Sequence, residues 1–125
     1  MVTGPARRSL LLVDDYEDAR EMYAEYLAGA GFDVTSAVDG EDAIAKARSA
    51  RFDLVILDLA LPKVDGITVI ETLRRSAGTE RVPIIVLSAS AGPDVQRKAM
   101  EAGATLYLYK PCLPDELEEA VRRVV

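Results

Sequence analysis

The feature that most constrains this fold is an uninterrupted apolar run at residues 54–57 that ends in Asp58. A run of this kind indicates a strand buried on both faces, as strands of parallel sheets are. A carboxylate directly after a buried strand is costly unless it has a partner or a chemical role. Because Pro62 and Asp65-Gly66 then interrupt regular structure, we expect Asp58 at the carboxyl end of a central strand, where ligands of open α/β folds bind.

Four more strands are expected, and each of the five is followed by a segment of helical apolar spacing. Residues 10–13 and 84–87 are also continuously apolar, whereas residues 33–37 and 105–109 are more polar. After the first strand the apolar stripe is Ala19, Met22, Tyr23, Tyr26 and Leu27. Strict alternation of strands and helices predicts a parallel sheet with right-handed crossovers.

The two more polar strands belong at the edges of the sheet, which the order 2-1-3-4-5 satisfies. The expected fold is therefore a single doubly wound (βα)5 domain of the α/β class, which is flavodoxin-like. Its switch point lies between strands one and three. Asp14 and Asp15 leave strand one there, and Asp58 leaves strand three. The fold is therefore expected to bring three carboxylates into one crevice.

Three neighbouring carboxylates repel each other unless positive charge lies among them. Mg²⁺ suits such oxygen ligands and keeps water positions open for phosphate. Lys110 follows strand five and Ser88 ends strand four, so an ammonium and a hydroxyl belong to the same rim. A carboxylate nucleophile, a metal, a lysine and a hydroxyl together favour phosphoryl transfer.

Each of these residues has an ordinary explanation when taken alone. Asp14-Asp15 suits a helix N-terminus, Lys110 suits a solvated surface and Ser88 suits a strand end. Their joint placement, each at the same end of its own strand, favours a functional site over these readings.

The length, net charge and residue composition of the chain exclude several classes of function. At 125 residues the chain is expected to form one domain. The net charge of −6 argues against direct binding of nucleic acid. A lone cysteine, Cys112, and the lack of any long apolar run predict a cytoplasmic chain that does not bind membranes. The absence of histidine excludes histidine-based catalysis and an internal phosphohistidine.

Four motifs in order, LLVDD, LDLALPKVDG, VLSA and YLYKP, resemble the receiver domain of bacterial two-component response regulators, the chemotaxis regulators included. The resemblance runs from about residue 10 to the last residue, so we expect a receiver domain at 9–125 after a disordered leader at 1–8. It implies that Asp58 is the phospho-acceptor. Lys110 and Ser88 would contact the phosphoryl group, and Tyr107 would be the aromatic switch residue that follows Ser88.

The same resemblance implies a Mg²⁺ site made by Asp14, Asp15, Asp58 and the backbone carbonyl of Ala60. Two positions depart from the family's pattern: Leu61 stands where methionine is frequent, and Cys112 where phenylalanine is common. Ala60 and Ser90 occupy positions at which the family tunes dephosphorylation.

The expected function is a signalling receiver, not an enzyme that turns over an external substrate. Its phosphoryl group would come from a phosphohistidine on a histidine kinase or histidine phosphotransfer protein, or from a small phosphodonor. Phosphorylation would change the face made by the fourth helix, fifth strand and fifth helix, which would bind a downstream effector protein, an output domain or a second copy of the chain.

Three alternatives compete with this interpretation. Metal-dependent phosphatases and phosphotransferases that use an aspartyl-phosphate typically carry a second aspartate, as general acid, two residues after the nucleophile, where this chain has Ala60. A flavodoxin-like cofactor binder needs a phosphate loop rich in Gly, Ser and Thr, whereas this chain has DDYED. The runner-up is a receiver-like scaffold that binds partners without phosphorylation, although its usual mark, loss of an acidic residue or of the lysine, is absent.

Overall fold

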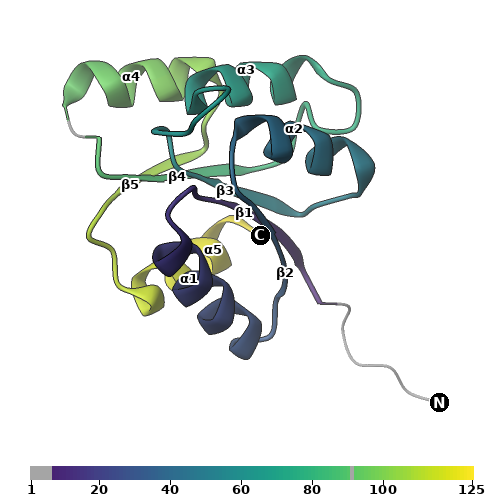
Figure 1. Cartoon of the computed structure of the whole chain (residues 1–125), viewed down its shortest axis with the longest axis vertical. Helices are drawn as coiled ribbons and strands as arrows, with labels where there is room; N and C mark the ends of the chain where they lie inside the picture. The colour runs from purple at the N-terminus through teal and green to yellow at the C-terminus, as the bar shows by residue number, and fades with distance from the viewer. Residues whose placement is uncertain (1–6, 91) are drawn as a thin grey trace.

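The computed structural model describes residues 7–90 and 92–125. Strands and helices alternate along the chain, as Figure 1 shows. The strands are β1 (Ser9–Val13), β2 (Asp33–Ala37), β3 (Leu54–Leu57), β4 (Ile84–Ser88) and β5 (Leu106–Tyr109). The helices are α1 (Glu17–Gly29), α2 (Gly40–Ser49), α3 (Gly66–Arg75), α4 (Pro93–Ala102) and α5 (Pro114–Val124). None of these helices is long and apolar enough to cross a bilayer.

The sheet is entirely parallel, and its order is β2-β1-β3-β4-β5, which confirms the expected doubly wound topology. The continuously apolar strands β1, β3 and β4 lie inside, and the two more polar strands are the edges. Helices α2, α3 and α4 cover one face of the sheet, and α1 and α5 cover the other (Figure 1). Alternate residues of the central strands enter two separate cores, because successive side chains of a strand point to opposite faces.

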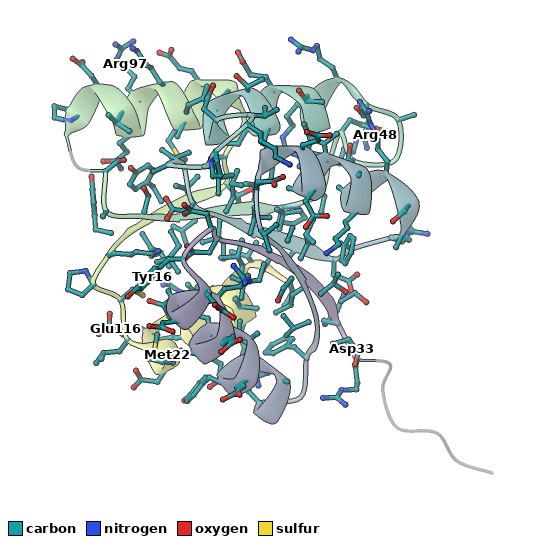
Figure 2. All side chains as sticks on the ribbon, viewed as in Figure 1. Tyr16, Met22, Asp33, Arg48, Arg97 and Glu116 are labelled. Atoms are coloured by element: carbon teal, nitrogen blue, oxygen red, sulfur yellow. The ribbon has the colours of Figure 1, made fainter. Side chains whose placement is uncertain are left out.

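The stripe predicted on α1 is wider than the stripe that the structure buries. Tyr23 and Leu27 are buried, but Met22 is 45% exposed and Tyr26 is 40% exposed. Met22 lies at the surface of the molecule (Figure 2). A single sheet layer covers only the helix positions along the line of contact, so the flanking apolar residues stay in solvent.

The first six residues of the expected leader lie outside the described residues. Arg7 and Arg8, its last two residues, are tied to the domain. The Arg7 guanidinium donates hydrogen bonds to the carbonyls of Ala28 and Gly31, and the Arg8 carbonyl accepts from the N–H of Asp33 at 2.9 Å. The part of the chain that belongs with the sheet therefore begins before residue 9.

Candidate functional site

Asp58 directly follows β3 and is held over the carboxyl edge of the sheet. Its N–H continues the ladder by donating to the carbonyl of Val13 at 3.0 Å. The residue is only 8% exposed. Its Oδ1 accepts two hydrogen bonds, from the Ser88 hydroxyl at 3.0 Å and from the N–H of Ala60 at 3.1 Å. These bonds orient one oxygen, so the carboxylate has a defined direction.

The loop after Asp58 turns back sharply, and Gly66 is the residue that permits it. A Cβ placed on Gly66 would lie 2.5 Å from the Cα of Leu59 and 2.9 Å from the carbonyl oxygen of Asp58. Only glycine allows this close approach between the start of α3 and the segment formed by Asp58 and Leu59. Asp65 then caps α3 by accepting from the N–H of Thr68 at 3.1 Å, which fixes where the helix begins.

Asp14 and Asp15 leave β1 next to Asp58. Asp14 is 2% exposed, and its Oδ1 accepts from the N–H of Tyr16 at 3.0 Å, whereas Asp15 is exposed. The guanidinium of Arg20 donates to the backbone carbonyl of Asp14 at 2.9 Å and so holds the loop from α1. Sequence reasoning did not identify Arg20, because its helical position gives no sign of which carbonyl it reaches.

Lys110 supplies the positive charge that the carboxylates need. Its N–H donates to the carbonyl of Ser88 at 2.9 Å, and its Nζ lies 2.7 Å from Asp14 Oδ2 and 3.2 Å from Asp58 Oδ2. Burial by itself would lower the pKa of Lys110. The hydrogen bond to Asp14 and the charge of Asp58 outweigh burial, so that the pKa lies above its usual value and the side chain stays charged.

A chain of hydrogen bonds leads from Asp58 to the edge of the sheet. The Ser88 side chain is fully buried, and its oxygen accepts from the N–H of Ser90 at 3.2 Å. The Tyr107 hydroxyl donates to the Ser90 carbonyl at 2.6 Å. Tyr107 points inward in this structure, since it is 8% exposed, and burial is the main cause of its raised pKa. The residue expected as the switch is therefore connected to Asp58 through Ser88 and Ser90.

The carboxylates also satisfy a first test for a divalent cation. Asp14, Asp15 and Asp58 each offer an oxygen, and these oxygens lie within 4.8 Å of one another. Hard oxygen donors at this spacing suit Mg²⁺. The backbone carbonyl of Ala60 stays an expected ligand.

Both departures from the family's pattern are accommodated in the cores. Leu61 packs against the core below α2 and α3. Cys112 is 7% exposed and lies in the opposite core with Tyr23 and Leu117, so the start of α5 is packed despite the smaller side chain.

The fold and the site together define a doubly wound α/β domain with a cluster of three carboxylates at its switch point. The family model of the response regulator receiver domain matches residues 10–122. The chain therefore belongs to the response regulator receiver domain family.

Relatives and solved structures agree with this assignment. The chain is 38% identical over 125 residues to the transcriptional regulatory protein PrrA of Mycobacterium tuberculosis, which covers 100% of this chain and 53% of that protein. The chain thus spans about half the length of that relative. It is also 36% identical to the gliding motility regulatory protein of Myxococcus xanthus, and that match covers 97% of this chain but only 16% of that protein.

Two solved structures are similar over nearly the whole chain. The chemotaxis protein CheY4 of Vibrio cholerae has a TM-score of 0.92 and 34% identity, with 96% of this chain and 100% of that chain covered. The receiver domain of the sensor histidine kinase PA1611 of Pseudomonas aeruginosa has a TM-score of 0.88 and 32% identity, covering 95% and 98%. In that structure a magnesium ion is coordinated in the active site cleft.

Proposed function

We propose that this domain accepts a phosphoryl group on Asp58 from a phosphohistidine of a histidine kinase or a histidine phosphotransfer protein. The observation that carries the proposal is that the two oxygens of the Asp58 carboxylate have different partners. One oxygen accepts hydrogen bonds from Ser88 and Ala60, and the other faces the ammonium of Lys110 at 3.2 Å. This arrangement orients a nucleophile and places positive charge beside it.

In the transfer step an Asp58 oxygen forms a bond to phosphorus while the P–N bond to the donor imidazole breaks. The imidazole keeps the electron pair and takes up a proton as it leaves. The phosphoryl group brings additional negative charge to the rim. Lys110 can then shift its contact from the carboxylate to the phosphoryl oxygens, and the Ser88 hydroxyl can donate to them.

Asp14, Asp15, Asp58 and the carbonyl of Ala60 would hold Mg²⁺, with the carboxylate oxygens within 4.8 Å of one another as the supporting observation. The bound ion would neutralise charge on the carboxylates and on the phosphoryl oxygens. Lys110 already offsets the charge of Asp14 and Asp58, so the exposed carboxylate of Asp15 is the one most available to the ion.

The proposed role is signalling and not turnover of an external substrate. The position two residues after the nucleophile is Ala60, which cannot act as a general acid. The expected consequence of phosphorylation is a change on the face made by α4, β5 and α5, transmitted from Ser88 through Ser90 to Tyr107. That face would then bind an effector protein, an output domain or a second copy of the chain.

The decisive experiment compares the wild type with Asp58→Asn after incubation with acetyl phosphate and Mg²⁺. We expect intact mass spectrometry to show a gain of about 80 Da, one phosphoryl group, on the wild type and none on Asp58→Asn. Asp94→Asn, which alters an exposed aspartate on α4, is the matched control and should gain the same mass as the wild type. A full gain on Asp58→Asn would exclude Asp58 as the acceptor, and no gain on the wild type would favour the scaffold alternative.

A further inference from the structure

The segment that carries Lys110 into α5 has few anchors. At its start the Lys110 N–H donates to Ser88, and at its end the Leu113 carbonyl accepts from the N–H of Leu117 at 3.1 Å. Pro111, between them, has no N–H to donate. Apart from the packing of the Cys112 side chain in the core and the ion pairs of Lys110 itself, the position of residues 110–113 therefore depends on hydrogen bonds from other elements.

Tyr23 provides that anchor from the other end of the sequence. Its hydroxyl donates to the backbone carbonyl of Cys112 at 2.7 Å, across 89 residues of chain. Within residues 7–90 and 92–125, this is the one hydrogen bond that joins the backbone of Cys112 to another element. It joins α1 directly to the segment that begins with Lys110.

The buried environment of Tyr23 stabilises its hydrogen bond to Cys112. Tyr23 is 4% exposed and packs in the core between α1, α5 and the sheet, with Leu27 and Leu117. Burial is the main cause of the raised pKa of Tyr23, so the hydroxyl stays protonated and remains a donor. A buried hydroxyl needs an acceptor, and the acceptor here lies two residues from the lysine of the site.

We propose that Tyr23 is a positioning residue for phosphoryl transfer: by holding the Cys112 carbonyl, it keeps the Lys110 ammonium within reach of Asp58. This inference rests on the function proposed above. The contact of Lys110 with Asp58 is 3.2 Å, longer than its 2.7 Å contact with Asp14. A loosened segment would therefore lose the Asp58 contact first and leave the lysine bound to Asp14.

Tyr23→Phe tests this with the ring retained and only the hydroxyl removed. Tyr26→Phe is the matched control, because it removes a hydroxyl from an exposed tyrosine one turn further along the same helix. We expect Tyr23→Phe to lower the rate of phosphorylation by saturating acetyl phosphate by about five- to ten-fold, since small misplacements of a catalytic group carry large rate costs. The Mg²⁺ concentration for half-maximal rate should not change, and Tyr26→Phe should match the wild type.

The second arm repeats the comparison in a Lys110→Ala background, with rates of phosphorylation and beryllofluoride affinity as readouts. If Tyr23 acts through the lysine, Tyr23→Phe will have no further effect there, because coupled residues are not additive. An equal loss in both backgrounds would show that Tyr23 only packs the core and would overturn the inference, as would a Tyr23→Phe rate equal to the wild type. A wild type that takes up no phosphoryl group would instead refute the proposed function itself.

Discussion

Gly66→Ala is the substitution whose effect the structure specifies most closely. The added Cβ would meet the Cα of Leu59 at 2.5 Å, the carbonyl oxygen of Asp58 at 2.9 Å and a methyl carbon of Leu59 also at 2.9 Å. Two of these three atoms are backbone, and both belong to the segment formed by Asp58 and Leu59. The segment must therefore move by about 1 Å to restore ordinary carbon contacts of about 3.5 Å.

Overpacking of this kind costs about 1–3 kcal/mol of the free energy of unfolding. Alanine at the first position of α3 recovers a fraction of that through its better helix propensity. We expect a net loss of about 1–2 kcal/mol, and a fall in melting temperature of roughly 3–8 °C for a domain of this size. Because the displaced atoms adjoin the Asp58 carboxylate, the rate of phosphorylation should fall about 10- to 100-fold.

The assay is thermal unfolding of Gly66→Ala beside the rate of phosphorylation by acetyl phosphate. Gly29→Ala is the control, since a Cβ on this last residue of α1 meets nothing within 4 Å. That variant should be as stable as the wild type or more stable, by up to about 1 kcal/mol. Wild-type stability and rate in Gly66→Ala would refute the reasoning that the approach of Asp58 and Leu59 to α3 needs glycine at this position.

Three further predictions concern the metal, a helix cap and the switch. Mg²⁺ should raise the melting temperature of the wild type, and Asp15→Asn should reduce that gain; an equal gain in both would remove the acidic pair as the metal site. Asp65→Ala should cost about 1 kcal/mol near neutral pH through loss of the α3 cap. The pKa of Asp65 is lowered from 3.8, chiefly by the Thr68 N–H, so the cap stabilises the fold above about pH 4 and its contribution is lost as the pH falls through the folded-state pKa. Denaturant unfolding should show the stabilities of Asp65→Ala and the wild type converging at low pH. A stability difference that stays constant with pH would contradict this. Tyr107→Ala should leave phosphorylation of Asp58 intact but weaken beryllofluoride-dependent self-association or partner binding, and a full wild-type response would make Tyr107 a packing residue only.

The sequence by itself determined the topology and the rim to which each site residue belongs. Uninterrupted apolar runs identify strands buried on both faces, and the more polar residues 33–37 identify an edge. Once the strands are parallel, their carboxyl ends must share one edge of the sheet, which brings Asp14, Asp58 and Lys110 together. These inferences need only local patterns and the handedness of the crossovers.

Only the tertiary structure decided which atoms meet. Tyr23 and Met22 are neighbours in the same apolar stripe, yet one is buried and bound to Cys112 while the other lies in solvent. The spacing of apolar residues gives the direction of a helix face but not the width that the sheet covers. Likewise, nothing near Arg20 or Tyr107 in the sequence marks their backbone partners, the carbonyls of Asp14 and Ser90. Such contacts depend on the distances between segments that are far apart in the chain. Those distances are set by how the helices pack on the sheet, and the order of apolar and polar residues along the sequence does not determine them.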